Sequence, residues 1–164
     1  MSNKMTGKQK EKPSVKKEKR LESIKKAHSQ KNSFTTTMED YLEVIYELVE
    51  LKGHASPTDI SNYMGVRPPS VTKMLQKLDS AGCLEYAKYR GIKLTAKGIS
   101  IANDIRQKHS ELLNFFEIIG VDRSIANKDA EGIEHHINPK TMKQLRKFTT
   151  FLKSNPDLLV LFNK

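Results

Sequence analysis

Apolar residues recur at helical spacing between residues 38 and 51, the first strongly patterned part of the chain. This spacing predicts an amphipathic helix. Thr37 is expected to cap its N-terminus, and Asp40 stands at the third helical position, where a carboxylate completes a pattern like a capping box. Gly53 is expected to end the helix.

Two further helix starts follow within twenty residues. Ser56-Pro57-Thr58-Asp59 combines a capping serine with proline at the first helical position and aspartate at the third, which predicts a short helix to about Met64. After Gly65, Pro68-Pro69-Ser70 begins a third helix that runs through Ser80. A helix, a turn containing glycine and a second helix are typical of the DNA-reading helix-turn-helix.

The third helix separates an apolar stripe from a polar face. The stripe consists of Val71, Met74, Leu75 and Leu78. The polar side chains are hydroxyl, amide and amine types that can contact base edges and phosphates, although a solvated helix face looks the same. The candidate DNA-binding residues in and before this helix are Arg67, Pro69, Ser70, Thr72, Lys73, Gln76 and Lys77.

A β-hairpin is predicted directly after this helix. Residues 84–89 alternate between apolar and polar types, Arg90-Gly91 forms a turn, and residues 92–95 return. Lys88 and Arg90 lie near the tip and complete the set of candidate DNA contacts. A helix-turn-helix followed by a basic hairpin predicts a winged helix-turn-helix.

The remaining pattern is helical. A long helix is predicted over residues 96–119, another from the cap Asp122 to about His136, and a third from Asn138-Pro139, with Met142, Leu145, Phe148 and Leu152 on one face. Two short helices and half of a long one cannot enclose a core of their own, so we expect a partner subunit to complete it. A homodimer also suits DNA with two-fold related half-sites.

The predicted fold class is therefore mainly α. A winged helix-turn-helix of three helices and a β-hairpin wing is joined by a long helix to an all-helical dimerisation lobe. The expected parts are a disordered basic tail over residues 1–34, a DNA-binding domain over 35–100, and a metal-binding and dimerisation domain over 101–164.

Charge and composition narrow the possible functions. Of the net charge of +10, most comes from residues 1–31, which carry 11 Lys and Arg residues against three Glu. This tail is either a solvated segment or an arm that binds phosphates. A single cysteine, Cys83, excludes a disulfide framework and any site with several thiolates. The absence of a long apolar stretch predicts a cytoplasmic protein without a membrane partner.

Carboxylates and histidines form a candidate metal site. Asp40 and Glu43 share a face of the first helix, and Glu131, Glu134 and His135 share a face by helical spacing. A further histidine, His109, lies midway along the long helix. Carboxylates and imidazoles suit manganese or ferrous ions, whereas each residue taken alone is also consistent with a cap or a solvated surface.

At this point the residues carry a resemblance to a known family. Residues 36 to about 153 resemble the manganese transport regulators, a branch of the diphtheria-toxin-repressor-like family of metal-dependent transcriptional repressors. The motifs that match are Met38-Glu39-Asp40-Tyr41-Leu42-Glu43, Pro69-Ser70-Val71-Thr72-Lys73-Met74, Lys88-Tyr89-Arg90-Gly91 and Glu131-Gly132-Ile133-Glu134-His135-His136.

The resemblance implies a repressor that binds palindromic operator DNA as a homodimer when Mn²⁺ is bound and that controls manganese-uptake genes. It also implies two Mn²⁺ ions per subunit, held by Asp40, Glu43, His109, Glu131, Glu134 and His135. Iron-responsive relatives typically have Met at the position of Asp40 and Cys at that of Glu131. The chain departs from the pattern in its basic tail, in Leu113, where relatives often have an acidic residue, and in its short C-terminus.

Two other classes of function stay open on the residues alone. A pair of bridged ions can activate water, as in a dinuclear metallohydrolase, although we find no His-Glu-x-x-His motif, nucleophile elbow or phosphate-binding glycine loop. The other alternative is a winged-helix regulator that responds to a different ligand. We expect a regulator rather than an enzyme, with no small organic substrate.

Overall fold

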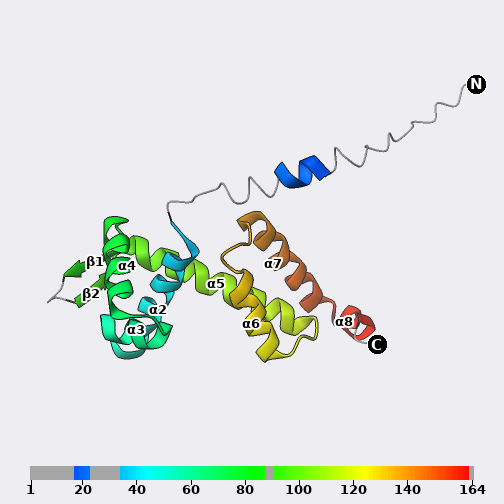
Figure 1. The fold of residues 1–164 in the computed structure, drawn as a ribbon. Coiled ribbons are helices and arrows are strands. Elements are labelled where there is room, and N and C mark those ends of the chain that lie inside the picture. Colours follow the sequence, from blue (N-terminus) through cyan, green and yellow to red (C-terminus); the bar gives the residue numbers. More distant parts are fainter. Residues whose placement is uncertain (1–16, 23–33, 88–90, 163–164) are drawn as a thin grey trace, which may run out of the picture. The chain divides into compact units, whose positions relative to one another are not determined.

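The computed structural model describes residues 17–22, 34–87 and 91–162. Residues from Thr36 onward form one compact unit, which is mainly helical with a small two-stranded sheet, as predicted (Figure 1). Its elements are α2 (Thr36–Lys52), α3 (Pro57–Met64), α4 (Pro68–Ser80), β1 (Leu84–Ala87), β2 (Gly91–Leu94), α5 (Ala96–Ile118), α6 (Arg123–Ile133), α7 (Pro139–Ser154) and α8 (Pro156–Phe162).

Residues 17–22 of the N-terminal unit form a short helix, and residues 34 and 35 of this unit are also described. Disorder is predicted for the whole tail, so this helix is a departure from that expectation. Its six residues are lysine, arginine, glutamate and leucine, all of which have high intrinsic helix propensity. The rest of the predicted tail, apart from Phe34, lies outside the described residues.

Local sequence signals explain most of the helix ends. Ser56 caps α3 in a complete capping box: its hydroxyl accepts from the backbone N–H of Asp59, whose carboxylate accepts from the Ser56 N–H. Gly65 ends α3 in the left-handed conformation with φ of 65°. Thr37 is not the cap of α2, because that helix already begins at Thr36.

The winged helix-turn-helix predicted from the pattern is confirmed. Helices α2, α3 and α4, strand β1 and the first half of α5 enclose one apolar core, and the predicted stripe of α4 faces it except for Met74, which is half-buried. The fully buried side chains of this core include Leu42, Ile45, Ile60, Val71, Leu75, Leu78, Leu84, Ala102 and Ile105.

The wing is an antiparallel hairpin in which Leu84 pairs with Leu94 and Ala87 pairs with Gly91. Strand β2 is as long as predicted but begins one residue earlier, at Gly91, and β1 is described up to Ala87. The expected contacts at the tip, Lys88 and Arg90, lie outside the described residues.

Helix α5 begins against the wing at a position that only glycine can fill. A Cβ built on Gly98 would lie 2.0 Å from the Cys83 carbonyl oxygen, which is a backbone atom that cannot swing away. We expect Gly98→Ala to lower the free energy of unfolding by about 1–3 kcal/mol or more, because overpacking forces the backbone to shift. Urea denaturation checks this.

Gly132→Ala is the matched control for this substitution, since Gly132 lies within α6 and a Cβ there meets nothing within 4 Å. Alanine is a better helix former than glycine, so this variant is expected to be as stable as the wild type or more stable. Equal stability of the two variants would contradict the close packing at Gly98.

The C-terminal part encloses a small core between α5, α6 and α7, so the expectation that these helices cannot enclose a core of their own is wrong. Leu112, Ala130 and Met142 are buried there, and Phe116 and Leu145 pack against them. On the predicted apolar face of α7, Leu152 is buried but Phe148 is 49% exposed. This face is therefore only partly covered within one subunit, where the ring of Phe148 lies 6.3 Å from that of Phe115 on α5, measured between centroids.

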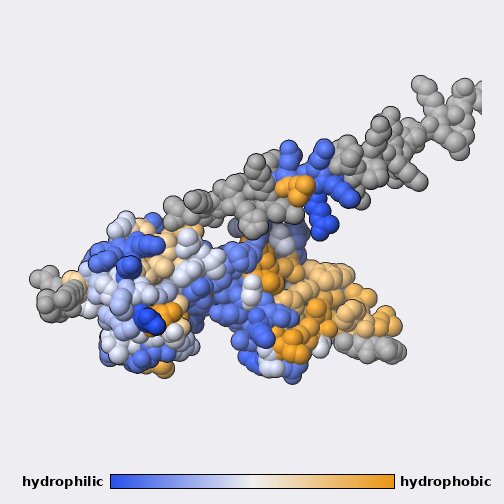
Figure 2. Space-filling view, in the orientation of Figure 1, coloured by the Kyte–Doolittle hydropathy of each residue, from blue (hydrophilic) through white to orange (hydrophobic). Residues whose placement is uncertain are grey.

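Apolar side chains gather on the surface of the C-terminal helices (Figure 2). They include Phe151 on α7 and Leu158, Leu161 and Phe162 on α8. Among the described residues, none of the helices combines the length and the apolar character that a bilayer-spanning segment requires.

Candidate functional site

The end of α6 determines where two of the candidate ligands lie. We predict a helix to about His136, but α6 ends at Ile133, and residues 134–136 form a turn. Glycine at position 132 weakens the end of this helix, and α7 starts at Pro139, so the chain must change direction between them. The turn directs His135 toward α2 and leaves Glu134 facing α5.

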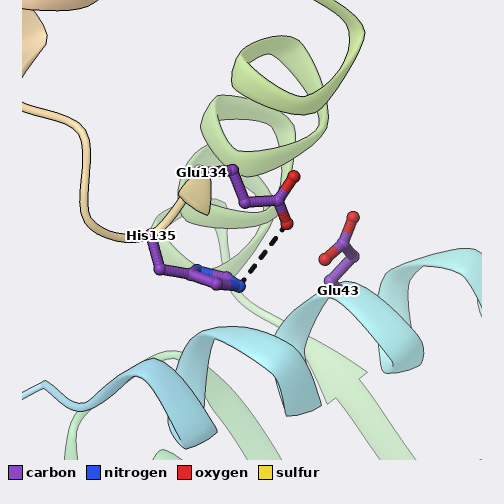
Figure 3. Close-up of side chains that lie close together, drawn as sticks. All are labelled: Glu43, Glu134 and His135. Atoms are coloured by element: carbon purple, nitrogen blue, oxygen red, sulfur yellow. Dashed lines mark ion pairs between the residues drawn. The ribbon is translucent and has the colours of Figure 1, made fainter. Parts of the chain in front are cut away.

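His135 connects the end of α6 to α2. Its Nε2 lies 3.0 Å from Asp40 Oδ1 and 3.4 Å from Glu134 Oε1. Figure 3 shows the side chains of Glu43, Glu134 and His135 turned toward one another, with Glu43 on α2. Candidate ligands from the winged helix and from the C-terminal helices therefore meet at one place.

His109 joins the same cluster from α5. Its Nδ1 lies 2.7 Å from Glu134 Oε2 and 3.7 Å from Glu131 Oε2. Glu134 is completely buried, whereas the Glu131 side chain is 65% exposed. The structure thus brings together all six residues expected from the sequence, with Glu134 between the two histidines and Glu131 at the edge facing the solvent.

Two groups of potential ligand atoms overlap in this cluster. Glu43, Glu134 and His135 form one, and His109, Glu131 and Glu134 form the other, with the atoms of each group within 4.8 Å of one another. Glu134 Oε1 is buried and has no hydrogen-bond partner. An unpartnered buried carboxylate oxygen beside two imidazole rings suits a divalent cation, because burying a charge without a partner is costly.

Electrostatics in the cluster favour an added positive charge. Burial, reinforced by the charges of Glu134 and Glu131, raises the pKa of Glu43 to about 7. Burial also raises the pKa values of Asp40 and Glu134. Although burial opposes it, the hydrogen bond to Glu134 raises the pKa of His109. Asp40, Glu43 and Glu134 therefore hold their protons more tightly here than in water, mainly because burial disfavours the charged carboxylate and partly because neighbouring carboxylates repel it.

We expect the metal-free protein to lose stability as the pH rises from about 4.5, the ordinary pKa of Glu43, to about 7. In this range the folded state binds the Glu43 proton more tightly than the unfolded state, so deprotonation favours unfolding. The other raised pKa values in the cluster act in the same direction. The lowered pKa of Asp59, about 2 because of Lys52 and Ser56, acts only below pH 3.8.

Urea denaturation in the presence of a chelator, repeated across this pH range, measures the effect. Glu43→Gln is the matched control, because it removes the titrating group and should flatten the slope. Stability that stays constant or rises with pH in the wild type would contradict the raised pKa values.

An open cleft of about 380 Å³ gives access to the cluster, with Asp40, Glu43 and Glu131 in its wall. Glu47, one turn along α2, also lines this cleft, but its carboxylate pairs with Arg106 at 2.9 Å. Arg106 additionally lies over the ring of Tyr46, 5.2 Å from its centroid. Glu47 thus extends the acidic face of α2, but the charge of Arg106 on α5 neutralises its carboxylate.

Two polar residues at the histidines are missing from the expectations drawn from the sequence. Glu39 Oε2 lies 2.6 Å from His135 Nδ1, and Asn127 Oδ1 lies 3.2 Å from His109 Nε2. Glu39 is four residues before Glu43, so helical spacing could have indicated it. Nothing in the sequence points to Asn127, because its contact depends on how α6 packs on α5.

The candidate DNA-binding surface lies on α4. The side chains of Ser70, Lys73, Gln76 and Lys77 are exposed, as are Arg67 and Pro69 before or at its first turn. Thr72 is half-buried, and its hydroxyl donates to the Pro68 carbonyl at 3.3 Å. This face is therefore free to contact a partner, with Thr72 the least available of the set.

Both parts of the chain match known domains. Residues 33–92 match the iron dependent repressor N-terminal DNA binding domain, and residues 95–159 match the iron dependent repressor metal binding and dimerisation domain. These are domains of a transcriptional regulator and not of an enzyme, which confirms that prediction.

Individual relatives agree with these domains. The HTH-type transcriptional regulator MntR of Listeria welshimeri serovar 6b is 45% identical over 125 residues, which cover 76% of this chain and 88% of the relative. MntR of Shouchella clausii is 46% identical over 121 residues, which cover 74% of this chain and 85% of the relative.

Among solved structures, the manganese regulator SloR is 30% identical with a TM-score of 0.60, and the match covers 70% of this chain and 54% of SloR. The chain thus spans about half the length of that solved regulator. The domain matches and the identity to MntR over most of the chain together show that the chain belongs to the iron dependent repressor family of transcriptional regulators.

Proposed function

We propose that the protein is a manganese-responsive transcriptional repressor that binds palindromic operator DNA as a homodimer and controls manganese-uptake genes. The observation that carries this proposal is the contact of His135 with Asp40, which joins the turn after α6 to the first helix of the winged helix. An ion bound between Asp40 and His135 would therefore directly restrict how the winged helix moves against the C-terminal helices. Because its target is DNA, the proposed role implies a cytoplasmic location.

The proposed ligands are Asp40, Glu43, His109, Glu131, Glu134 and His135. Two ions per subunit are proposed because the two groups of ligand atoms share Glu134, whose two oxygens face different histidines. Carboxylate oxygens and imidazole nitrogens without a thiolate suit Mn²⁺. The names of the MntR and SloR relatives support the choice of manganese.

The metal is proposed to act by changing the population of arrangements that can bind DNA. Without the ion, repulsion among the carboxylates of α2 and α6 favours arrangements in which these helices separate. An ion held from both sides favours the arrangement in which they meet. DNA that selects the same arrangement must tighten metal binding by the same factor, and such couplings are typically about 1–3 kcal/mol.

The proposed DNA contacts are the exposed residues of and before α4, together with the hairpin residues Lys88 and Arg90. The proposed division places DNA binding in residues 35–100, and metal binding and dimerisation in residues 101–164. The apolar surface of α7 and α8 supports dimerisation through the second part, because a second copy would remove these side chains from water. Two winged helices related by a two-fold axis suit a palindromic site.

Selection of genomic DNA fragments by the purified full-length protein tests the function. The selection is run at about 0.15 M salt, close to physiological ionic strength, with and without Mn²⁺, and the bound fragments are sequenced. Enrichment of a palindromic site only with Mn²⁺ is the expected result. Enrichment that does not depend on the metal would overturn the metal switch, and no enrichment in either condition would overturn the repressor function.

A further inference from the structure

Each histidine of the cluster has a polar neighbour at both of its ring nitrogens. Each ring has one nitrogen facing the acidic cluster and the other nitrogen facing an acceptor outside the six proposed ligands. For His135 the nitrogen facing the cluster is Nε2 and the outer acceptor is Glu39. For His109 it is Nδ1, and the outer acceptor is Asn127.

Both inner nitrogens face carboxylates, with His135 Nε2 3.0 Å from Asp40 and His109 Nδ1 2.7 Å from Glu134. A cation held by these carboxylates would displace a proton from the inner nitrogens, so that the outer contacts decide where each neutral ring keeps its proton. A carboxylate accepts hydrogen bonds and cannot donate them, so the 2.6 Å contact with Glu39 keeps a proton on His135 Nδ1. The amide oxygen of Asn127 likewise accepts from His109 Nε2 at 3.2 Å. Once a neutral ring has its proton on the outer nitrogen, the lone pair of the inner nitrogen faces the cluster.

We propose that Glu39 and Asn127 are positioning residues that fix the two rings in opposite tautomers, so that His135 offers Nε2 and His109 offers Nδ1 to the metal. This inference rests on the proposed function, because it concerns the metal of that site. A metal-binding histidine needs its free lone pair directed at the ion, and outer hydrogen-bond partners set both the tautomer and the ring orientation.

Glu39 and Asn127 differ in how deeply their contacts with the histidines are buried. The His135 side chain is 6% exposed and Glu39 is 25% exposed, and they connect residues 96 apart in the chain. Asn127 is exposed on α6, and its contact with His109 spans 18 residues. We therefore expect Glu39 to have the larger effect of the two.

The first test concerns the metal-free protein and needs no ion. Nitrogen-15 NMR of the imidazole rings, at a pH above their titration, identifies the tautomer of each histidine. In the metal-free wild type we expect the proton on Nδ1 of His135, because the 2.6 Å contact with Glu39 is shorter than the 3.0 Å contact of Nε2 with Asp40. His109 is not used in this test, because its Nδ1 lies 2.7 Å from the Glu134 carboxylate when no cation is bound. In Glu39→Leu, His135 is expected to gain the other tautomer, whereas Glu39→Gln keeps an acceptor and is expected to retain Nδ1–H.

The second test measures Mn²⁺ affinity by calorimetry in the same variants. Glu39→Leu is expected to weaken binding about 10- to 100-fold, the usual effect of losing an outer partner, and Glu39→Gln is expected to lose less. Glutamine removes the charge of Glu39 but keeps a hydrogen-bond acceptor. The comparison therefore distinguishes an effect on the orientation of His135 from the electrostatic attraction between Glu39 and Mn²⁺. Glu50→Leu, at an exposed position on the same helix, controls for a general effect on α2.

Asn127 is tested in the same way. Asn127→Leu is expected to weaken Mn²⁺ binding, whereas Asn127→Asp, which keeps an acceptor for His109 Nε2, should restore it. Asn103→Leu, at an exposed position on α5, is the control. Retention of Nδ1–H as the tautomer of His135 in Glu39→Leu, equal Mn²⁺ affinity in Glu39→Leu and Glu39→Gln, or wild-type Mn²⁺ affinity in Asn127→Leu would overturn the inference.

The design distinguishes failure of this inference from failure of the proposed function. A wild type with the expected His135 tautomer that does not bind Mn²⁺ would overturn the function. A wild type that binds Mn²⁺ and responds to it, with a His135 tautomer that does not depend on Glu39 and a Mn²⁺ affinity that does not depend on Asn127, would overturn only the inference.

Discussion

Glu134→Gln is expected to abolish the response of DNA binding to Mn²⁺ and to weaken Mn²⁺ binding by at least about 100-fold, while the helical content stays unchanged. Loss of an outer partner of a metal ligand already costs about 10- to 100-fold in affinity, and Glu134 is proposed as a ligand in both groups. Its buried carboxylate is the one part of the cluster that faces both His109 and His135.

Calorimetry with Mn²⁺ and fluorescence anisotropy with operator DNA measure the two effects separately. Glutamine has nearly the same volume as glutamate, so the fold is preserved while the charge is removed. Glu50→Gln, which alters an exposed glutamate on α2, is the matched control and is expected to behave as the wild type. A Glu134→Gln variant that retains tight Mn²⁺ binding would contradict the proposed ligand set.

Substitutions on the DNA-binding surface are expected to weaken DNA binding and to leave Mn²⁺ binding unchanged. Lys73→Ala should weaken operator binding about tenfold or more at saturating Mn²⁺, because a good contact to a base contributes about 1–3 kcal/mol. Mn²⁺ affinity in the absence of DNA should not change, because Lys73 is exposed on α4, outside the metal cluster. Gln76→Ala is expected to act in the same direction.

Anisotropy titrations at several salt concentrations distinguish the kinds of contact. If Lys73 binds phosphate, its loss lowers the salt dependence, whereas loss of a contact to a base leaves the salt dependence unchanged. Lys140→Ala, which removes an exposed lysine at the start of α7, is the matched control. Unchanged operator binding in both Lys73→Ala and Gln76→Ala would remove α4 from the proposed interface.

The winged helix could be predicted because its signals are local. The capping box of Ser56 and Asp59, the left-handed Gly65 and the proline starts of α4 and α7 depend on contacts within a few residues. The end of α6 could not be predicted in the same way. Helical periodicity continues through His135 in the sequence, but the chain has to turn back toward α7.

The residue types and their spacing indicated the candidate ligands, whereas their convergence was implied only by the family resemblance. Asp40 and Glu43 are close on one helix whatever the fold, whereas His109 could have been an isolated polar residue on α5. Its position beside Glu134 depends on the packing of α6 against α5 through Leu112 and Ala130.

The sequence by itself determined the order of helices and strands, the polar face of α4 and the choice of oxygen and nitrogen ligands, because capping, periodicity and side-chain chemistry act over short distances along the chain. Only the tertiary structure decided that Glu134 lies between the two histidines and that Glu39 and Asn127 hold the outer ring nitrogens. These contacts join residues far apart in sequence, and they form only because apolar packing brings α2, α5 and the end of α6 together.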